Sequence, residues 1–306
     1  MLKPESAYDH GYAVSGDIQI HYAAQGQGRL VLFLHGFPEF WVEWEHQLCA
    51  FGAQYHAVAP DLRGYNLSGK PSLPRQYHVK LLVEDIRNLV HHLGHRKMVL
   101  VAHDWGGGVA WAFANRHPEM VEKLVIINSP HPAVFARELL NNPDQQTASA
   151  YMNMFRSPDA EKIISEDNYR YLKDALTKGL SRWKPSDALL QAYVAAWSRP
   201  GALTGGLNYY RVSPLHPPTS EAETAIIRQI ADAPRDMFAV QVPTLVIWGE
   251  LDEALLPGNL EGLESHVDQL RIERIPDGTH WVVHEQPDLV NRLIRSFVED
   301  KSPHSI

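Results

Sequence analysis

The stretch Val99-Leu-Val-Ala-His-Asp104-Trp-Gly-Gly-Gly108 begins with an apolar run and ends with three glycines, and Asp104 is the one acidic residue between them. The run Met98–His103 has the continuous apolar character of a central strand that is buried on both faces. After it we expect a helix over Gly106–His117, which ends before Pro118 because a residue that precedes proline disfavours the helical conformation. The segment therefore predicts a strand, a sharp turn with Asp104 at its tip, and a helix.

Outward from this segment, short apolar runs alternate with amphipathic stretches. This alternation is typical of a mostly parallel sheet with crossover helices. We expect strands at Ile18–Ala24, Leu30–His35, His56–Pro60 and Val121–Ile127, and helices at Trp41–Phe51 and Val79–Leu93. The pattern returns late in the chain, with strands expected at Pro243–Trp248 and Leu270–Ile275 and a helix near Pro287–Val298. The predicted fold class is α/β, with a mostly parallel central sheet flanked by helices.

Between these two parts of the sheet the strand pattern disappears. From about residue 131 to residue 235 the chain has helical periodicity, many aromatic residues and frequent proline and glycine. We interpret this segment as an inserted helical subdomain. The predicted division is a discontinuous core over residues 1–130 and 236–306, with a helical cap, or lid, over residues 131–235.

The composition argues against several classes of function. The 306 residues carry a formal net charge of −8 without a block of like charges, which disfavours nucleic-acid binding and anchoring to an anionic membrane. The single cysteine, Cys49, cannot form an intramolecular disulfide. No stretch approaches the roughly 18 apolar residues of a membrane-spanning helix. We expect a soluble, cytoplasmic protein.

Neither a cofactor nor a metal ion is implied. His91 and His95 have the i, i+4 spacing of a metal-binding pair, but no third ligand is apparent, and cationic residues are favoured near a helix C-terminus. The glycines at residues 106–108 lack the spacing of a dinucleotide-binding motif.

An aspartate at the tip of a sharp turn can act as a nucleophile. A carboxylate with a reference pKa of about 3.9 is ionised at neutral pH and can attack an sp³ carbon without a base, which leaves an alkyl ester on Asp104. Water must then cleave this ester, and that step needs a general base. The alternative for an aspartate between a strand and a helix is a simple N-cap. The glycines that follow Asp104 favour the nucleophile.

Later segments of the chain supply an acid and a base. Asp252 and His280 each lie just past an expected strand, where α/β sheets gather their chemistry. We predict that Asp252 orients His280, and that His280 activates water. Glu250 and Glu253 are the alternatives for the orienting acid. The order along the chain is nucleophile, acid, base.

The negative charge that forms during ester cleavage also needs hydrogen-bond donors. The stretch Leu34-His-Gly-Phe-Pro-Glu-Phe-Trp41 follows an apolar strand and can present the backbone N–H of Phe37 to the turn. With the N–H of Trp105 it forms a candidate oxyanion hole. Pro38 has no N–H, so we assign it a structural role, with a cis peptide bond as one form of it.

These motifs together resemble the α/β-hydrolase superfamily over nearly the whole chain and, within it, the epoxide hydrolases. The related haloalkane and haloacid dehalogenases share most of the motifs, whereas the last one discriminates. The motifs are His35-Gly-Phe-Pro-Glu39, Asp61-Leu-Arg-Gly-Tyr65 with Ser68-Gly-Lys-Pro71, His103-Asp-Trp-Gly-Gly107, and Leu207-Asn-Tyr-Tyr-Arg211.

The resemblance implies two cap tyrosines that point their hydroxyls at the epoxide oxygen. Tyr210 matches one of them and Tyr151 the other, with Tyr209 as the alternative to its neighbour. A phenol can hydrogen-bond the ring-opening alkoxide and protonate it, which a poor leaving group needs. The expected substrates are a small epoxide and water, and the expected product is a vicinal diol. A homodimer is one expected assembly.

Two other functions remain open at this point. A haloalkane dehalogenase would use the same Asp104, Asp252 and His280, with Trp105 and either Trp183 or Trp197 holding the halide. The other alternative is a non-catalytic α/β-hydrolase fold that binds a ligand or partner. Trp105 stands where fluoroacetate dehalogenases carry an arginine, which disfavours a substrate that bears a carboxylate.

Overall fold

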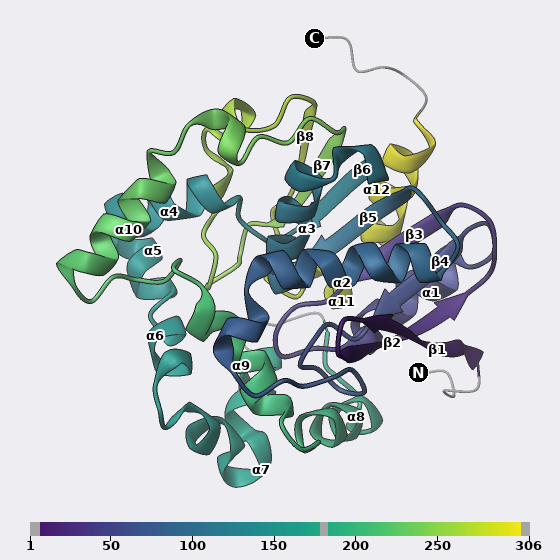
Figure 1. Ribbon diagram of the computed structural model, residues 1–306, viewed down its shortest axis with the longest axis horizontal. Coiled ribbons are helices and arrows are strands. Elements are labelled where there is room, and N and C mark those ends of the chain that lie inside the picture. Colours follow the sequence, from purple (N-terminus) through teal and green to yellow (C-terminus); the bar gives the residue numbers. More distant parts are fainter. Residues whose placement is uncertain (1–6, 178–182, 301–306) are drawn as a thin grey trace.

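The computed structural model describes residues 7–177 and 183–300 and contains one eight-stranded sheet (Figure 1). The strand order is β1-β2-β4-β3-β5-β6-β7-β8, in which β3 to β8 run parallel and β2 is antiparallel to both of its neighbours. The strands are β1 (Asp9–Ser15), β2 (Ile18–Gln25), β3 (Leu30–Leu34), β4 (His56–Pro60), β5 (Met98–His103), β6 (Val121–Ile127), β7 (Thr244–Gly249) and β8 (Leu270–Ile275). The predicted fold class is confirmed.

The first strand, β1, is absent from the prediction. Its sequence, Asp-His-Gly-Tyr-Ala-Val-Ser, is mostly polar, and four of its seven residues are exposed. An edge strand that buries so little has no apolar run to identify it. Its conformation depends instead on antiparallel pairing with β2 along its whole length.

Helices cover both faces of the sheet. In Figure 1, α2 and α3 lie in front of it, whereas α12 lies behind it, and α12 packs against α1. The helices outside the β6–β7 connection are α1 (Glu45–Phe51), α2 (Val79–His92), α3 (Asp104–Arg116), α11 (Val282–Glu285) and α12 (Pro287–Glu299). Short 3₁₀ helices lie at Trp41–Trp44, Pro74–Tyr77, Pro118–Met120, Arg235–Met237, Pro257–Leu260 and Leu263–Ser265.

Two predicted helix boundaries are wrong. The helix expected over Trp41–Phe51 is a 3₁₀ helix followed by α1, because its first turn is tightened to i→i+3 hydrogen bonds. The helix expected from Gly106 begins at Asp104. A periodicity argument places a boundary only to within a few residues, and here the first helical turn includes the acidic residue itself.

Seven α-helices, joined by irregular segments, make up most of the described part of the connection between β6 and β7. It carries α4 (Pro132–Asn141), α5 (Pro143–Ala148), α6 (Tyr151–Arg156), α7 (Ala160–Thr177), α8 (Asp187–Trp197), α9 (Ala202–Val212) and α10 (Glu221–Ala231). In Figure 1, α6 to α9 lie together below the sheet. Helix α9 approaches the loop after β4 so closely that a Cβ added at Gly205 would lie 2.4 Å from the carbonyl oxygen of Gly64.

The parallel strands end at one edge of the sheet, and the loops that follow them meet there. Leu34 of β3 pairs with Ala102 of β5, and His103 pairs with Ile127 of β6. The loops after β3, β5, β6, β7 and β8 therefore lie next to one another. In the two ranges that the structure describes, no helix has the length and apolarity needed to cross a membrane.

Candidate active site

Asp104 is the first residue of α3 and has a left-handed backbone, with φ at +47°. Non-glycine residues seldom adopt this conformation, and at active sites it is held by the surrounding structure. The loop after β3 presses against the turn, because a Cβ on Gly36 would lie 2.4 Å from that of Asp104. The N-cap position belongs to His103. Asp104 is therefore a projecting side chain rather than an N-cap.

Backbone amides from two loops surround the Asp104 carboxylate. The N–H of Phe37 donates to Oδ1 at 2.8 Å, and the N–H of Trp105 also donates to the carboxylate. The Phe37–Pro38 peptide bond is cis, one of the forms considered for Pro38. Both donors that the sequence suggested are thus brought to the acid. They lie where an oxyanion would form on a substituted Asp104 carboxyl group.

His280 connects Asp104 to Asp252. Its Nδ1 lies 2.7 Å from Oδ2 of Asp252, and its Nε2 lies 3.7 Å from Oδ2 of Asp104. Asp252 is 2% exposed, and its other oxygen accepts hydrogen bonds from the backbone amides of Ala254 and Leu255. These contacts allow a base to be oriented by a fixed acid.

The two alternatives for the orienting acid have other environments, although Glu253 also lines the cavity that contains His280. Glu250 pairs with Arg274 at 3.0 Å, and the Glu253 side chain is exposed. Sequence reasoning missed a supporting residue, Asn128, whose side-chain amide donates to Oδ2 of Asp252 at 2.8 Å. Its left-handed φ of +40°, just past β6, is a feature that asparagine tolerates better than most residues.

The charges of the three groups are linked. Burial by itself would lower the pKa of His280, but the carboxylates of Asp252 and Asp104 raise that pKa to about 9. Burial would raise the pKa of Asp252, but the His280 charge lowers it below its usual value. Burial raises the pKa of Asp104, against the opposing effect of His280. The shifts of His280 and Asp252 together favour an imidazolium beside the Asp252 carboxylate.

Neutralising Asp104 is expected to lower the pKa of His280 below about 9, because one of the two facing carboxylates loses its charge. An Asp104→Asn variant, titrated by NMR of the His280 ring, tests this. Glu250→Gln is the control, since that carboxylate pairs with Arg274 and its removal should leave the His280 pKa unchanged. An unchanged pKa in Asp104→Asn would contradict the charge coupling.

Tyr151 and Tyr210 come from α6 and α9 and line one cavity with Asp104 and His280. Their ring centroids are 6.2 Å apart, and the Tyr210 ring packs edge-on against Phe37 and Trp105. Burial raises the pKa of both tyrosines well above the usual value, so both hydroxyls stay protonated.

The neighbouring Tyr209 has a different environment. Its hydroxyl donates to the carbonyl oxygen of Arg63 at 2.9 Å, and its side chain is 1% exposed. Consecutive helical residues project about 100° apart, so α9 cannot direct both hydroxyls to the same place. Of the two, Tyr210 is the one that lines the cavity with His280.

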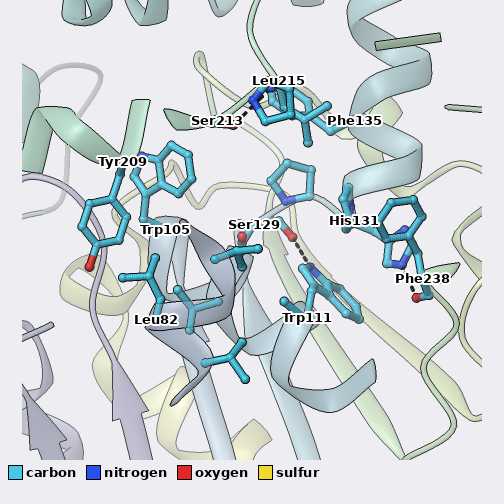
Figure 2. Close-up of a pocket in the computed structure, with 18 of the residues that line it drawn as sticks. Leu82, Trp105, Trp111, Ser129, His131, Phe135, Tyr209, Ser213, Leu215 and Phe238 are labelled. Carbon is cyan, nitrogen blue, oxygen red and sulfur yellow. Dashed lines mark hydrogen bonds between the residues drawn. The ribbon is translucent and has the colours of Figure 1, made fainter. Parts of the chain in front are cut away.

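Two cavities meet at Asp104. The one with the tyrosines has a volume of about 300 Å³ and also contains Phe155 and Trp281. The second, of about 460 Å³, extends past Trp105 and Trp111 to Phe135 and Leu215 (Figure 2). Most of its lining is apolar, with Leu82 and Phe238 also drawn there. This volume suits an apolar or aromatic group next to a reacting carbon.

Trp183 and Trp197, the alternatives considered as a second halide donor beside Trp105, make other contacts. The Trp197 indole N–H donates to the carbonyl oxygen of Pro38 at 2.6 Å, and Trp183 stacks on His284 with ring centroids 4.5 Å apart. The indole N–H of Trp197 is thus committed to the backbone. This arrangement disfavours halide binding by Trp197.

Of the histidine pair His91 and His95, the second contacts another histidine. His95 lies 3.0 Å from His56 through ring nitrogens. Among the described residues, the one group of three side chains close enough to share a cation is Glu39, Glu43 and His103, which lies behind the Asp104 turn. Sequence reasoning missed this group. The sequence feature that could have indicated it is the pair Glu39 and Glu43, which are four positions apart among aromatic residues that pack against a sheet.

Comparison with known proteins gives the family. Residues 29–287 match the model of the α/β-hydrolase fold. Epoxide hydrolase 4 of Mus musculus is 37% identical over 294 residues, 93% of this chain and 77% of that protein. Epoxide hydrolase 3 of Xenopus tropicalis is 37% identical over 95% of this chain and 78% of its own length.

Solved structures agree. The epoxide hydrolase of Bacillus megaterium in complex with an inhibitor superposes with a TM-score of 0.88 at 37% identity, over 95% of this chain and all of that one. An epoxide hydrolase of Vigna radiata has a TM-score of 0.78 at 29% identity, over 97% and 99% of the two chains. With an aspartate at the turn and two tyrosines facing it, the chain belongs to the α/β-hydrolase family and, within it, to the epoxide hydrolases.

Proposed function

We propose that this protein hydrolyses epoxides to vicinal diols in two covalent steps. One observation carries the proposal: a carboxylate and two protonated phenols line the same cavity, with an acid-oriented histidine beside the carboxylate. A carboxylate supplies the nucleophile for a strained ring, and phenols supply the proton that its oxygen needs.

In the first step, an oxygen of Asp104 attacks one ring carbon and the carbon–oxygen bond of the epoxide breaks. Tyr151 and Tyr210 hydrogen-bond the departing oxygen, and one of them transfers its proton to it. The product is a hydroxyalkyl ester on Asp104. The Phe37 N–H, 2.8 Å from Oδ1, holds the carboxylate in place for this attack.

In the second step, His280 takes a proton from water, and the water oxygen attacks the ester carbon of Asp104. The negative charge that develops on the carboxyl oxygen is held by the amides of Phe37 and Trp105. This intermediate collapses by breaking the bond between the carboxyl carbon and the alkyl oxygen, and His280 returns its proton to that oxygen as the diol leaves. The proton that Asp104 releases on returning to a carboxylate restores the tyrosine that gave up its own in the first step. Esterified Asp104 has no negative charge, and that charge is one of those that raise the pKa of His280. The pKa of His280 is therefore lower once the substrate is attached, and the neutral base forms more readily. Asp252 holds the ring and balances the imidazolium.

We further propose that residues 131–235 act as a lid over a core of residues 1–130 and 236–306, because both tyrosines belong to the helical connection and the triad to the sheet loops. The apolar lining of the larger cavity favours epoxides with aryl or alkyl substituents. A cytoplasmic location is proposed on the single cysteine, Cys49. A homodimer stays a prediction.

Replacing Tyr210 by phenylalanine is expected to slow ring opening about 10²-fold, because the departing oxygen loses a proton donor. Tyr151→Phe should act in the same direction, and the double variant should be slower than either. Styrene oxide consumption and the single-turnover rate of ester formation are the measurements.

Tyr209→Phe is the matched control, since it is the same substitution one residue away. It removes a buried hydrogen bond to Arg63, so we expect a loss of about 1 kcal/mol of stability with little change in ring opening. Wild-type rates in Tyr210→Phe would refute the assigned proton donor. Bromide release from 1-bromobutane without diol formation from styrene oxide would instead support the dehalogenase.

A further inference from the structure

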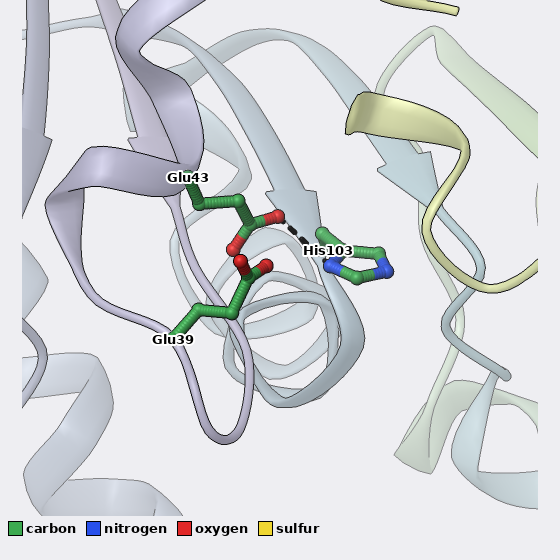
Figure 3. A group of neighbouring side chains, drawn as sticks. All are labelled: Glu39, Glu43 and His103. Atoms are coloured by element: carbon green, nitrogen blue, oxygen red, sulfur yellow. Dashed lines mark ion pairs between the residues drawn. The ribbon is translucent and has the colours of Figure 1, made fainter. Parts of the chain in front are cut away.

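Three buried titratable side chains lie directly behind the turn that carries Asp104. They are Glu39 and Glu43, from the segment after β3, and His103, the last residue of β5; each is 1% exposed. In Figure 3 the two carboxyl groups face each other, and one oxygen of Glu43 points to the His103 ring. Glu43 and His103 line neither of the cavities at Asp104.

The contacts of His103 determine where its own proton lies. Its Nε2 is 2.9 Å from the carbonyl oxygen of His280, which can only accept, so Nε2 carries the hydrogen. Its Nδ1 is 2.8 Å from Oε1 of Glu43. Neither atom has a hydrogen bond of regular geometry, so the proton between them has two possible arrangements. Either Nδ1 is protonated and faces a carboxylate, or Nδ1 is bare and accepts a proton from a neutral carboxylic acid.

The surrounding charges favour the neutral arrangement. The His103 ring centroid is 4.6 Å from that of His280, so a cation on His103 would oppose the imidazolium of His280. Accordingly, burial and the His280 charge lower the pKa of His103 to about 3.

The two carboxyl groups have unequal partners. Oε1 of Glu39 accepts from Tyr193 and lies 2.7 Å from Nε2 of His284. Burial alone would raise the pKa of Glu39, but His284 lowers it to about 2. Burial and the facing Glu39 carboxylate raise the pKa of Glu43 well above its usual range. Adjacent buried carboxyl groups seldom both ionise, so Glu39 keeps the charge.

We propose that Glu43 is a neutral carboxylic acid that positions both halves of the machinery for ester cleavage, by donating its proton to Nδ1 of His103 and accepting the Gly36 N–H. The latter contact, from Gly36 N to Oε2, measures 3.2 Å. Gly36 precedes Phe37, which supplies an oxyanion donor, and His103 holds the backbone of His280. One side chain thus links the oxyanion loop to the loop of the base.

This role rests on the proposed function, and glutamine tests it because its amide reproduces both hydrogen bonds without a charge. The NH₂ group can donate to His103 and the carbonyl can accept from Gly36. We expect Glu43→Gln to hydrolyse the Asp104 ester at close to the wild-type rate. Glu43→Leu removes both bonds, and its ester hydrolysis should fall at least about tenfold, with substrate binding unchanged.

Single-turnover kinetics with styrene oxide separate ester formation from ester hydrolysis. A role confined to packing would lower the melting temperature of Glu43→Leu without slowing hydrolysis in the folded fraction, and that result would overturn the proposal. Loss of hydrolysis in Glu43→Gln to the level of Glu43→Leu would also overturn it, since it would mean that an ionised carboxylate is required.

An infrared difference spectrum of wild type minus Glu43→Gln at neutral pH gives a second readout that needs no turnover. The proposal requires a carbonyl band of a protonated carboxyl group in the wild type that the variant lacks. Absence of this band would refute a neutral Glu43. A stoichiometric divalent metal ion in the purified wild type, missing from purified Glu43→Gln, would refute it as well. If the wild type opened no epoxide, the proposed function would fail, while this spectrum would still decide the protonation of Glu43.

Discussion

Asp104→Ala is expected to abolish diol formation, with a loss of at least about 10⁴-fold in turnover. The reason is that no other described carboxylate has the Phe37 amide, the His280 ring and the two tyrosines around it. The measurement is diol formation from styrene oxide, with a thermal melt to show that the variant is folded.

Asp104→Asn is the companion variant, because asparagine tolerates the left-handed φ of +47° better than alanine does. Its amide oxygen can still accept the Phe37 N–H, so the turn should be retained while the nucleophile is lost. Diol formation by a folded Asp104→Ala protein at the wild-type rate would overturn the assignment of Asp104 and return it to a structural role.

His280→Gln is expected to stop turnover after one step and leave about one alkyl ester per chain. Asp104 needs no base for its attack, whereas the water that cleaves the ester does. Intact-protein mass spectrometry after exposure to styrene oxide should show a gain equal to the whole epoxide mass. The experiment belongs at mildly alkaline pH, because removing His280 also removes the charge that opposes the raised pKa of Asp104.

The double variant Asp104→Ala/His280→Gln is the control and should show no gain in mass. With 1-bromobutane in place of the epoxide, a gain of the butyl group alone, with bromide released, would identify a dehalogenase. Absence of any adduct in His280→Gln, with the wild type active on styrene oxide, would rule out a covalent alkyl-enzyme and with it the two-step mechanism.

Much of the site follows from local sequence. Asp104, Asp252 and His280 each stand just past an apolar run, and parallel strands deliver their carboxyl ends to one edge. Phe37 could be proposed as a donor because it comes directly after β3, the strand beside β5. None of these inferences needs the helical connection between β6 and β7.

Other features depend on contacts between distant segments. β1 is mostly exposed, so only its pairing with β2 identifies it. The separate environments of Tyr209 and Tyr210 depend on how α9 lies against the loop that contains Arg63. The pairing of Glu43 with His103 joins residues that are 60 positions apart in the chain.

The sequence by itself determined the α/β class and placed Asp104, Asp252 and His280 just past the ends of strands, because hydrophobic period and turn chemistry act over a few neighbouring residues. Only the tertiary structure decided that Tyr210 rather than Tyr209 lines the cavity with His280, how the two cavities meet at Asp104, and which buried acid keeps its proton. Those outcomes depend on side-chain direction, desolvation and facing charges, and these arise only when segments far apart in the chain are packed together.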